Sequence, residues 1–98
     1  MKISSQKYID QEIVDIKIEE QDFVVTLADI ENDGDEYELV VDGHHSLEAA
    51  KQAGVDPVYQ YSEYDYQSEI NSMGFDDFLA SHYMDSDWYD IETGVSVW

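Results

Sequence analysis

The feature that most constrains the fold is a tight turn between two runs of β-forming residues. Asn32-Asp33-Gly34-Asp35 is a strong hairpin signal, because Asp-Gly readily supplies the positive φ angles of a two-residue turn. The segment Asp22 to Ala28 before it and the segment Glu36 to Asp42 after it are rich in Val, Leu, Phe and Tyr. We therefore predict two strands joined by this turn.

Two further strands are predicted outside the hairpin. Residues Glu12 to Glu19 alternate around Ile16 and Ile18, which is typical of a strand. Val55 to Tyr61 also predicts a strand, and Pro57 near its start favours an edge position because proline cannot donate to a ladder.

Helical patterns begin at Gly43. The alanine-rich segment that follows predicts a short helix with His45 or Ser46 near its N-cap and Gly54 as its C-terminal cap. Other expected elements are a short helix or loop over Tyr64 to Ser72, a helix over Phe75 to Tyr83, and a hairpin of Trp88 to Ile91 with Val95 to Trp98. The chain is thus predicted to be one α+β domain over residues 1–98, a small mixed sheet of five or six strands with two or three short helices.

Charge limits what this domain can bind. The sequence has 24 Asp and Glu against four Lys and no Arg, a formal net charge of −20. Phosphate backbones and anionic membranes are held by Lys and Arg, so we predict no direct binding to either. No apolar run reaches membrane-span length, no signal peptide is evident and cysteine is absent, which favours a cytoplasmic protein without thiolate metal sites.

The acidity has two interpretations. Acid-rich surfaces aid solubility, and they occur in halophilic proteomes. Alternatively, carboxylates imitate a nucleic-acid backbone and steer the chain toward a basic groove on another protein. The near-complete lack of cations favours the second interpretation, because a merely soluble surface normally mixes both signs.

One segment resembles a known family. Residues Glu36 to Val58 run EYELVVDGHHSLEAAKQAGVDPV, a strand, a glycine turn, an Ala-rich helix and a strand. This segment resembles the ParB/sulfiredoxin-like family, which implies a ParB/sulfiredoxin-like core and a ligand or nucleotide site at the turn. The candidate residues of that site are Asp42, Gly43, His44, His45, Ser46 and Glu48.

The sequence also differs from the family pattern at important positions. An arginine that contacts phosphate or takes part in chemistry in the family is replaced by Ser46 here, and the cysteine of sulfiredoxin is missing. The chain is also too short for the DNA-binding domain of ParB proteins. We therefore predict no catalytic residues, and an enzyme is the less favoured alternative.

Two segments carry side chains that could bind a metal ion. His44 and His45 could bind a metal with Asp42 and Glu48, or one could pack under the helix while the other bonds the turn; they lack the i, i+4 spacing of helical zinc sites. Asp29 to Asp35 resembles the start of a calcium loop, but its twelfth position would be Val40 instead of a chelating glutamate. We predict no metal and no cofactor.

The C-terminal half supplies the predicted partner-binding residues. Its tyrosines either fill the core or form an interface, and its carboxylates would replace phosphates. The predicted set is Glu63, Asp65, Glu69, Asp76, Asp77, Asp85 and Asp87, with Tyr64 and Tyr66.

Three functions are therefore considered. The preferred one is an acidic inhibitor or decoy that binds a basic nucleic-acid-binding protein, in the manner of the DNA mimics, anti-restriction proteins and anti-CRISPR proteins of phages and mobile elements. The alternatives are a small ParB/sulfiredoxin-like nucleotide-binding domain or enzyme, and an interaction module without mimicry, such as a homodimer built on an exposed strand edge.

Overall fold

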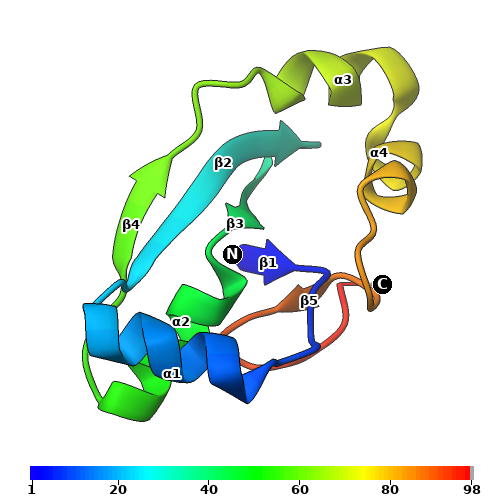
Figure 1. Ribbon diagram of the computed structural model, residues 1–98. Coiled ribbons are helices and arrows are strands. Elements are labelled where there is room, and N and C mark those ends of the chain that lie inside the picture. The colour runs from blue at the N-terminus through cyan, green and yellow to red at the C-terminus, as the bar shows by residue number, and fades with distance from the viewer. Residues whose placement is uncertain (98) are drawn as a thin grey trace.

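The protein is a mixed α+β fold, as predicted, although residues 1–97 form four helices instead of two or three. A computed structural model describes residues 1–97 as one five-stranded sheet, in the order β4-β2-β3-β1-β5, with four helices around it (Figure 1). In chain order the elements are β1 (Lys2–Ser4), α1 (Gln11–Glu20), β2 (Val24–Asn32), β3 (Asp35–Asp42), α2 (His44–Ala53), β4 (Val58–Tyr61), α3 (Tyr66–Met73), α4 (Phe75–Ser81) and β5 (Tyr89–Asp90).

The predicted hairpin is the centre of the sheet. Asp33 and Gly34 have φ angles of 53° and 84°, the two positive values of a type I′ turn, and β2 pairs antiparallel with β3. On either side, β4 runs parallel to β2 and β1 runs parallel to β3. The expected edge position of β4 is confirmed, but the strand begins at Val58 and not at Val55, since Pro57 cannot donate to the ladder.

The segment predicted as a strand over Glu12 to Glu19 is instead helix α1, so that prediction was wrong. The Asp10 side chain caps the helix by accepting from the Glu12 amide, and Gln21 ends it in the left-handed conformation with φ 55°. Val14 alone is buried among its residues, and the helix packs on α2. Capping and helix packing here outweigh the strand preference of the isoleucines.

Helix α2 begins and ends at glycines. Its N-cap is Gly43, not the predicted His45 or Ser46, and its C-cap is Gly54 as expected. The helical alternative for Tyr64 to Ser72 is confirmed by α3, which runs from Tyr66 to Met73. The next predicted helix is confirmed by α4, which ends at Ser81 instead of Tyr83. The final hairpin is confirmed as far as residue 97 by an antiparallel bridge between Tyr89 and Ser96, whereas the short strand β1 was not predicted. Within residues 1–97, no helix has the length and apolar character to cross a bilayer.

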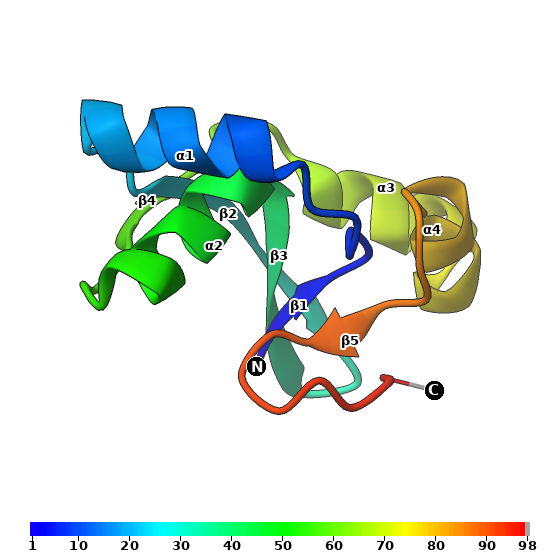
Figure 2. The ribbon, with the colours of Figure 1, turned by 60° about the horizontal axis from the view of Figure 1, so that its bottom comes forward.

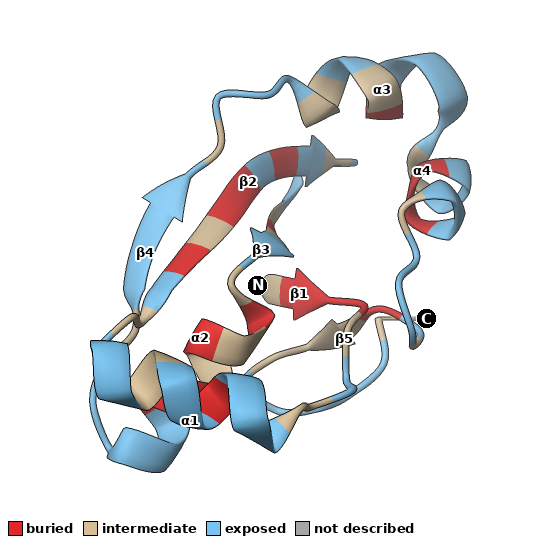
Figure 3. Cartoon of the chain, in the orientation of Figure 1, coloured by how far each residue is buried: buried red, intermediate tan, exposed pale blue. Residues whose placement is uncertain are grey.

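Helices cover the two faces of the sheet at different ends (Figure 2). The main core forms where α3, α4 and the segment before β5 cover Ile3, Ala28, Ile30 and Leu39 with Ile70, Phe78, Leu79 and Trp88. A second buried group consists of Val14, Val25, Leu27, Ala49 and Ala50, where α1 packs on α2 and α2 on β2. Strand β4 is exposed along its whole length, as Figure 3 shows.

Candidate functional site

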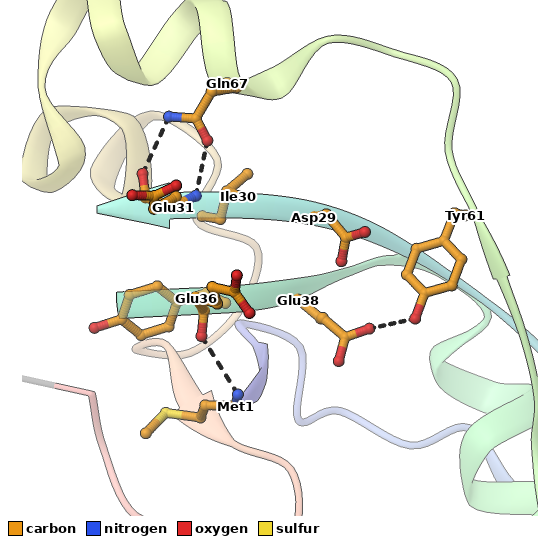
Figure 4. A pocket seen from close by; sticks show the side chains of 9 residues that line it. Met1, Asp29, Ile30, Glu31, Glu36, Glu38, Tyr61 and Gln67 are labelled. Atoms are coloured by element: carbon orange, nitrogen blue, oxygen red, sulfur yellow. Dashed lines mark hydrogen bonds between the residues drawn. The ribbon is translucent and has the colours of Figure 1, made fainter. Parts of the chain in front are cut away.

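Four carboxylates share one face of the β2–β3 hairpin, and we call them the acidic face: Asp29, Glu31, Glu36 and Glu38. The strand register places Glu31 directly opposite Glu36, and Asp29 directly opposite Glu38. Residues that face each other across a ladder, and residues two apart on one strand, point to the same side of the sheet. The hairpin therefore holds two like-charge pairs side by side (Figure 4).

Both pairs are non-hydrogen-bonded pairs of the ladder, the narrow positions at which opposed side chains lie closest together. The Glu31 amide donates to the Gln67 side chain at 2.7 Å, and the Gln67 amide group donates back to the Glu31 carbonyl at 3.0 Å. The Glu31 backbone thus points away from β3, which identifies Glu31–Glu36 as a non-hydrogen-bonded pair. Asp29–Glu38, two residues along, is a pair of the same kind, and Cα atoms at such positions are about 4.5 Å apart.

Two cations compensate part of this charge. The N-terminal ammonium of Met1 donates to the Glu36 carbonyl oxygen at 3.5 Å, and its charge contributes to lowering the pKa of Glu38. The Lys2 ammonium lies 3.4 Å from Oε1 of Glu38, and the Tyr61 hydroxyl donates to Oε2 of the same carboxylate at 2.6 Å. The Tyr61 hydrogen bond, followed by the Lys2 charge, lowers the pKa of Glu38, and in return the pKa of Tyr61 rises to about 12. The side chains of Asp29, Glu31 and Glu36 have no ion pair or hydrogen bond within residues 1–97.

The acidic face forms an open hollow of about 580 Å³, bounded by Met1, Tyr61 and Gln67. Within the described residues, no three His, Asp or Glu side chains converge closely enough to hold a metal ion. Carboxylates set side by side with little compensation attract several separate cations, such as a row of Lys or Arg side chains.

Three of the predicted partner-binding carboxylates hold the fold together. Asp65 caps α3 by accepting from the Ser68 amide and hydroxyl, and these bonds lower its pKa. Asp85 accepts from the amides of Lys7 and Tyr8 at 2.6 and 3.2 Å, which fixes the loop after β1. Glu69 lies 3.5 Å from the His82 ring.

The other predicted partner-binding residues differ in exposure. Four of these carboxylates are exposed and have no side-chain partner within residues 1–97: Glu63, Asp76, Asp77 and Asp87. Tyr64 is 59% exposed, whereas Tyr66 packs edge-on against Phe78 and His82 at the margin of the core. The predicted set is therefore spread over several elements and does not form a single cluster with the acidic face.

The turn from Asp42 to Glu48 is closed by contacts within the chain. The Gly43 amide donates to the Asp42 side chain at 2.8 Å, and a Cβ on Gly43 would lie 2.5 Å from the Val24 carbonyl oxygen. Gly43, with φ 90°, thus lets α2 start directly against β2. Glu48 accepts from Gln52 on the exposed side of the helix.

The histidines and Ser46 of this turn also have internal roles. His44 is buried, its Nε2 lies 3.1 Å from the Tyr8 carbonyl oxygen, and burial is the main cause that lowers its pKa. His45 accepts from the Asp10 amide at 3.2 Å, at the start of α1. The Ser46 hydroxyl is buried beside Asp22, where it adds to the larger effect of Lys17 in lowering the pKa of that carboxylate. The packing alternative for His44 is confirmed; nucleotide binding by this turn stays a prediction that titration with nucleotides would test.

Comparison of the chain with models of protein families, with curated proteins and with solved structures gave no match. Relationship to the ParB/sulfiredoxin-like family therefore stays a prediction. The acidic face was not predicted from the sequence, because Asp29 to Asp35 was interpreted only as a turn or a calcium loop. The sequence does contain a pattern that indicates this face. Acidic residues stand two apart on both sides of the turn, at 29 and 31 and at 36 and 38, and alternate residues of a strand share one face.

Proposed function

We propose that this protein binds a basic surface of a nucleic-acid-binding protein and occupies it with carboxylates in place of phosphates. The observation that carries the proposal is the acidic face, two opposed carboxylate pairs that the Lys2 and N-terminal ammonium groups only partly compensate. Its charges lie about 7 Å apart along each strand and about 5 Å apart across the pair, so one Lys- and Arg-lined groove can contact all four. We place this activity in the cytoplasm.

The arrangement of the charges supports binding over solubility alone. Like charges directly opposite in a ladder destabilise a sheet by up to about 1 kcal/mol per pair. Solubility needs net charge but does not need carboxylates to face each other, since the same number could be spread over the helices. A partner that supplies cations would turn this repulsion into attraction.

The test compares two variants with the same net charge. One carries Asp29→Asn, Glu31→Gln, Glu36→Gln and Glu38→Gln; the other carries Glu12→Gln, Asp15→Asn, Glu19→Gln and Glu20→Gln on the exposed side of α1. Each is immobilised, and nuclease-treated lysate of the source cells is passed over it at 50 mM and 500 mM NaCl.

We expect the wild type and the α1 variant to capture nucleic-acid-binding proteins at low salt, and duplex DNA or RNA to displace them. The hairpin variant should lose this capture, because the α1 variant retains the acidic face and the hairpin variant does not. Equal capture by both variants would contradict a role for the acidic face, and absence of nucleic-acid-binding proteins from the wild-type eluate would contradict the function itself.

A further inference from the structure

Strand β4 leaves one side of its backbone without a partner. The amides of Val58 and Ser62 donate to the carbonyl oxygens of Phe23 and Leu27, at 2.8 and 2.7 Å. Alternate residues of a parallel ladder bond the same neighbour, so Tyr59 and Tyr61 direct their N–H and C=O groups away from β2. Within residues 1–97, nothing pairs with that side, because β4 is the terminal strand of the sheet.

Two further edge positions of the sheet are occupied by other parts of the chain. Beyond the end of β4, the backbone of Glu31 on β2 is occupied by the Gln67 side chain. At the opposite side of the sheet, β5 has two residues and is bridged by Ser96. Natural proteins commonly block an open edge in such ways, or with charges and bulges along the strand. Strand β4, with the uncharged sequence Val58-Tyr59-Gln60-Tyr61, has none of these along its length.

The charges around β4 indicate what can pair with it. Asp56 precedes the strand and Glu63 follows it, and the Tyr61 hydroxyl contacts Glu38 of the acidic face. A second copy of this chain would bring its own Asp56 and Glu63 against the same carboxylates, with a net charge of −20 on each molecule. A strand with Lys or Arg at alternate positions would instead place cations near Asp56 and Glu63, the carboxylates that flank β4.

We propose that the free edge of β4 pairs with an extended, Lys- or Arg-bearing segment of the partner protein, which adds a sixth strand to the sheet. The inference rests on the proposed function for the sign of the partner's charge. It adds a recognition mode in which backbone hydrogen bonds from Tyr59 and Tyr61 fix the register, and Lys or Arg side chains of the added strand lie toward Asp56 and Glu63 at its two ends.

The probe is a blocked eight-residue peptide of alternating Lys and Val, compared with one of alternating Glu and Val. Two variants isolate the backbone contribution: Tyr61→Pro and Tyr61→Ala both remove the ring and its bond to Glu38, but only proline removes the outward N–H. Proline is tolerated at such an edge position, since the bonds to β2 come from the neighbouring residues. Circular dichroism and the urea midpoint check that both variants fold.

We expect the Lys-Val peptide to bind the full chain and to slow hydrogen exchange at the Tyr59 and Tyr61 amides, while the Glu-Val peptide does not bind. Tyr61→Pro should bind the Lys-Val peptide roughly tenfold more weakly than Tyr61→Ala, the effect of one lost hydrogen bond. Peptide binding that is equal in the two variants, with no protection of the two amides, would overturn the edge mode and leave the charge-based function standing.

Self-association gives an independent outcome. A concentration-dependent dimer that Tyr61→Ala retains and Tyr61→Pro loses would overturn the inference, because the edge would then belong to a second copy. Failure of the lysate experiment together with normal peptide binding and amide protection would instead refute the proposed function and support the edge as a peptide-binding site.

Discussion

Replacing Glu36 with glutamine should stabilise the fold, and the gain should depend on Glu31. The two residues face each other in a narrow position of the β2–β3 ladder, and neither carboxylate has a partner within residues 1–97. Removing one charge therefore removes a repulsion and breaks no hydrogen bond or ion pair. A destabilising effect is the usual result of a substitution, so the sign of this prediction is itself informative.

The size of the gain follows from Coulomb's law. Two carboxylates about 5 Å apart in a solvent-like dielectric repel by about 0.8 kcal/mol before screening. With Debye lengths of roughly 30 Å at 0.01 M and 3 Å at 1 M salt, the repulsion becomes about 0.7 and about 0.15 kcal/mol. Since the urea slope of a small domain is about 1–2 kcal/mol/M, the low-salt gain moves the midpoint by roughly 0.5 M.

The assay is urea unfolding at 10 mM and 1 M NaCl. Glu63→Gln is the matched control, because it lowers the net charge equally but has no carboxylate opposite it in a ladder. In a Glu31→Gln background, Glu36→Gln should raise the urea midpoint by no more than Glu63→Gln does. The reasoning would be refuted if Glu36→Gln and Glu63→Gln had equal urea midpoints at low salt, or if Glu36→Gln still raised the midpoint by more than the control in the Glu31→Gln background.

Three further predictions concern the candidate turn, a histidine and a predicted partner residue. Gly43→Ala should cost about 3 kcal/mol or more, since its Cβ would overlap a β2 carbonyl, whereas Gly34→Ala, with a positive φ but open space, should cost about 1 kcal/mol; urea midpoints compare them. Burial lowers the pKa of His44 below its unfolded value near 6.5. The stability that comes from the neutral imidazole is therefore present above pH 6.5 and is lost as the pH falls through the folded pKa. His44→Gln should reduce the change in urea midpoint between pH 7.5 and pH 5. Asp85→Asn should cost about 1 kcal/mol by weakening bonds to two loop amides, while Asp87→Asn should leave thermal stability nearly unchanged, and equal losses would contradict this division of roles.

Local signals in the sequence predicted much of the fold. The Asp33-Gly34 turn, the strands beside it and the helix ending at Gly54 were all recognised, because turn chemistry and capping act within a few residues. Helix α1 was misassigned, because its isoleucines favour a strand locally and its packing partner, α2, lies thirty residues later. Strand β1 has three residues and forms by pairing with β3, a contact that no local pattern reveals.

Composition alone determined the sign of this protein's net charge: with 24 carboxylates and four lysines, any fold of this chain is strongly negative. Only the tertiary structure decided which carboxylates act together. Pairing of β2 with β3 sets Asp29 and Glu31 against Glu38 and Glu36, while Asp65 and Asp85 are engaged by backbone amides of the fold. The reason is physical: charge is a sum over residues, whereas repulsion and recognition depend on distances that strand register and loop packing set.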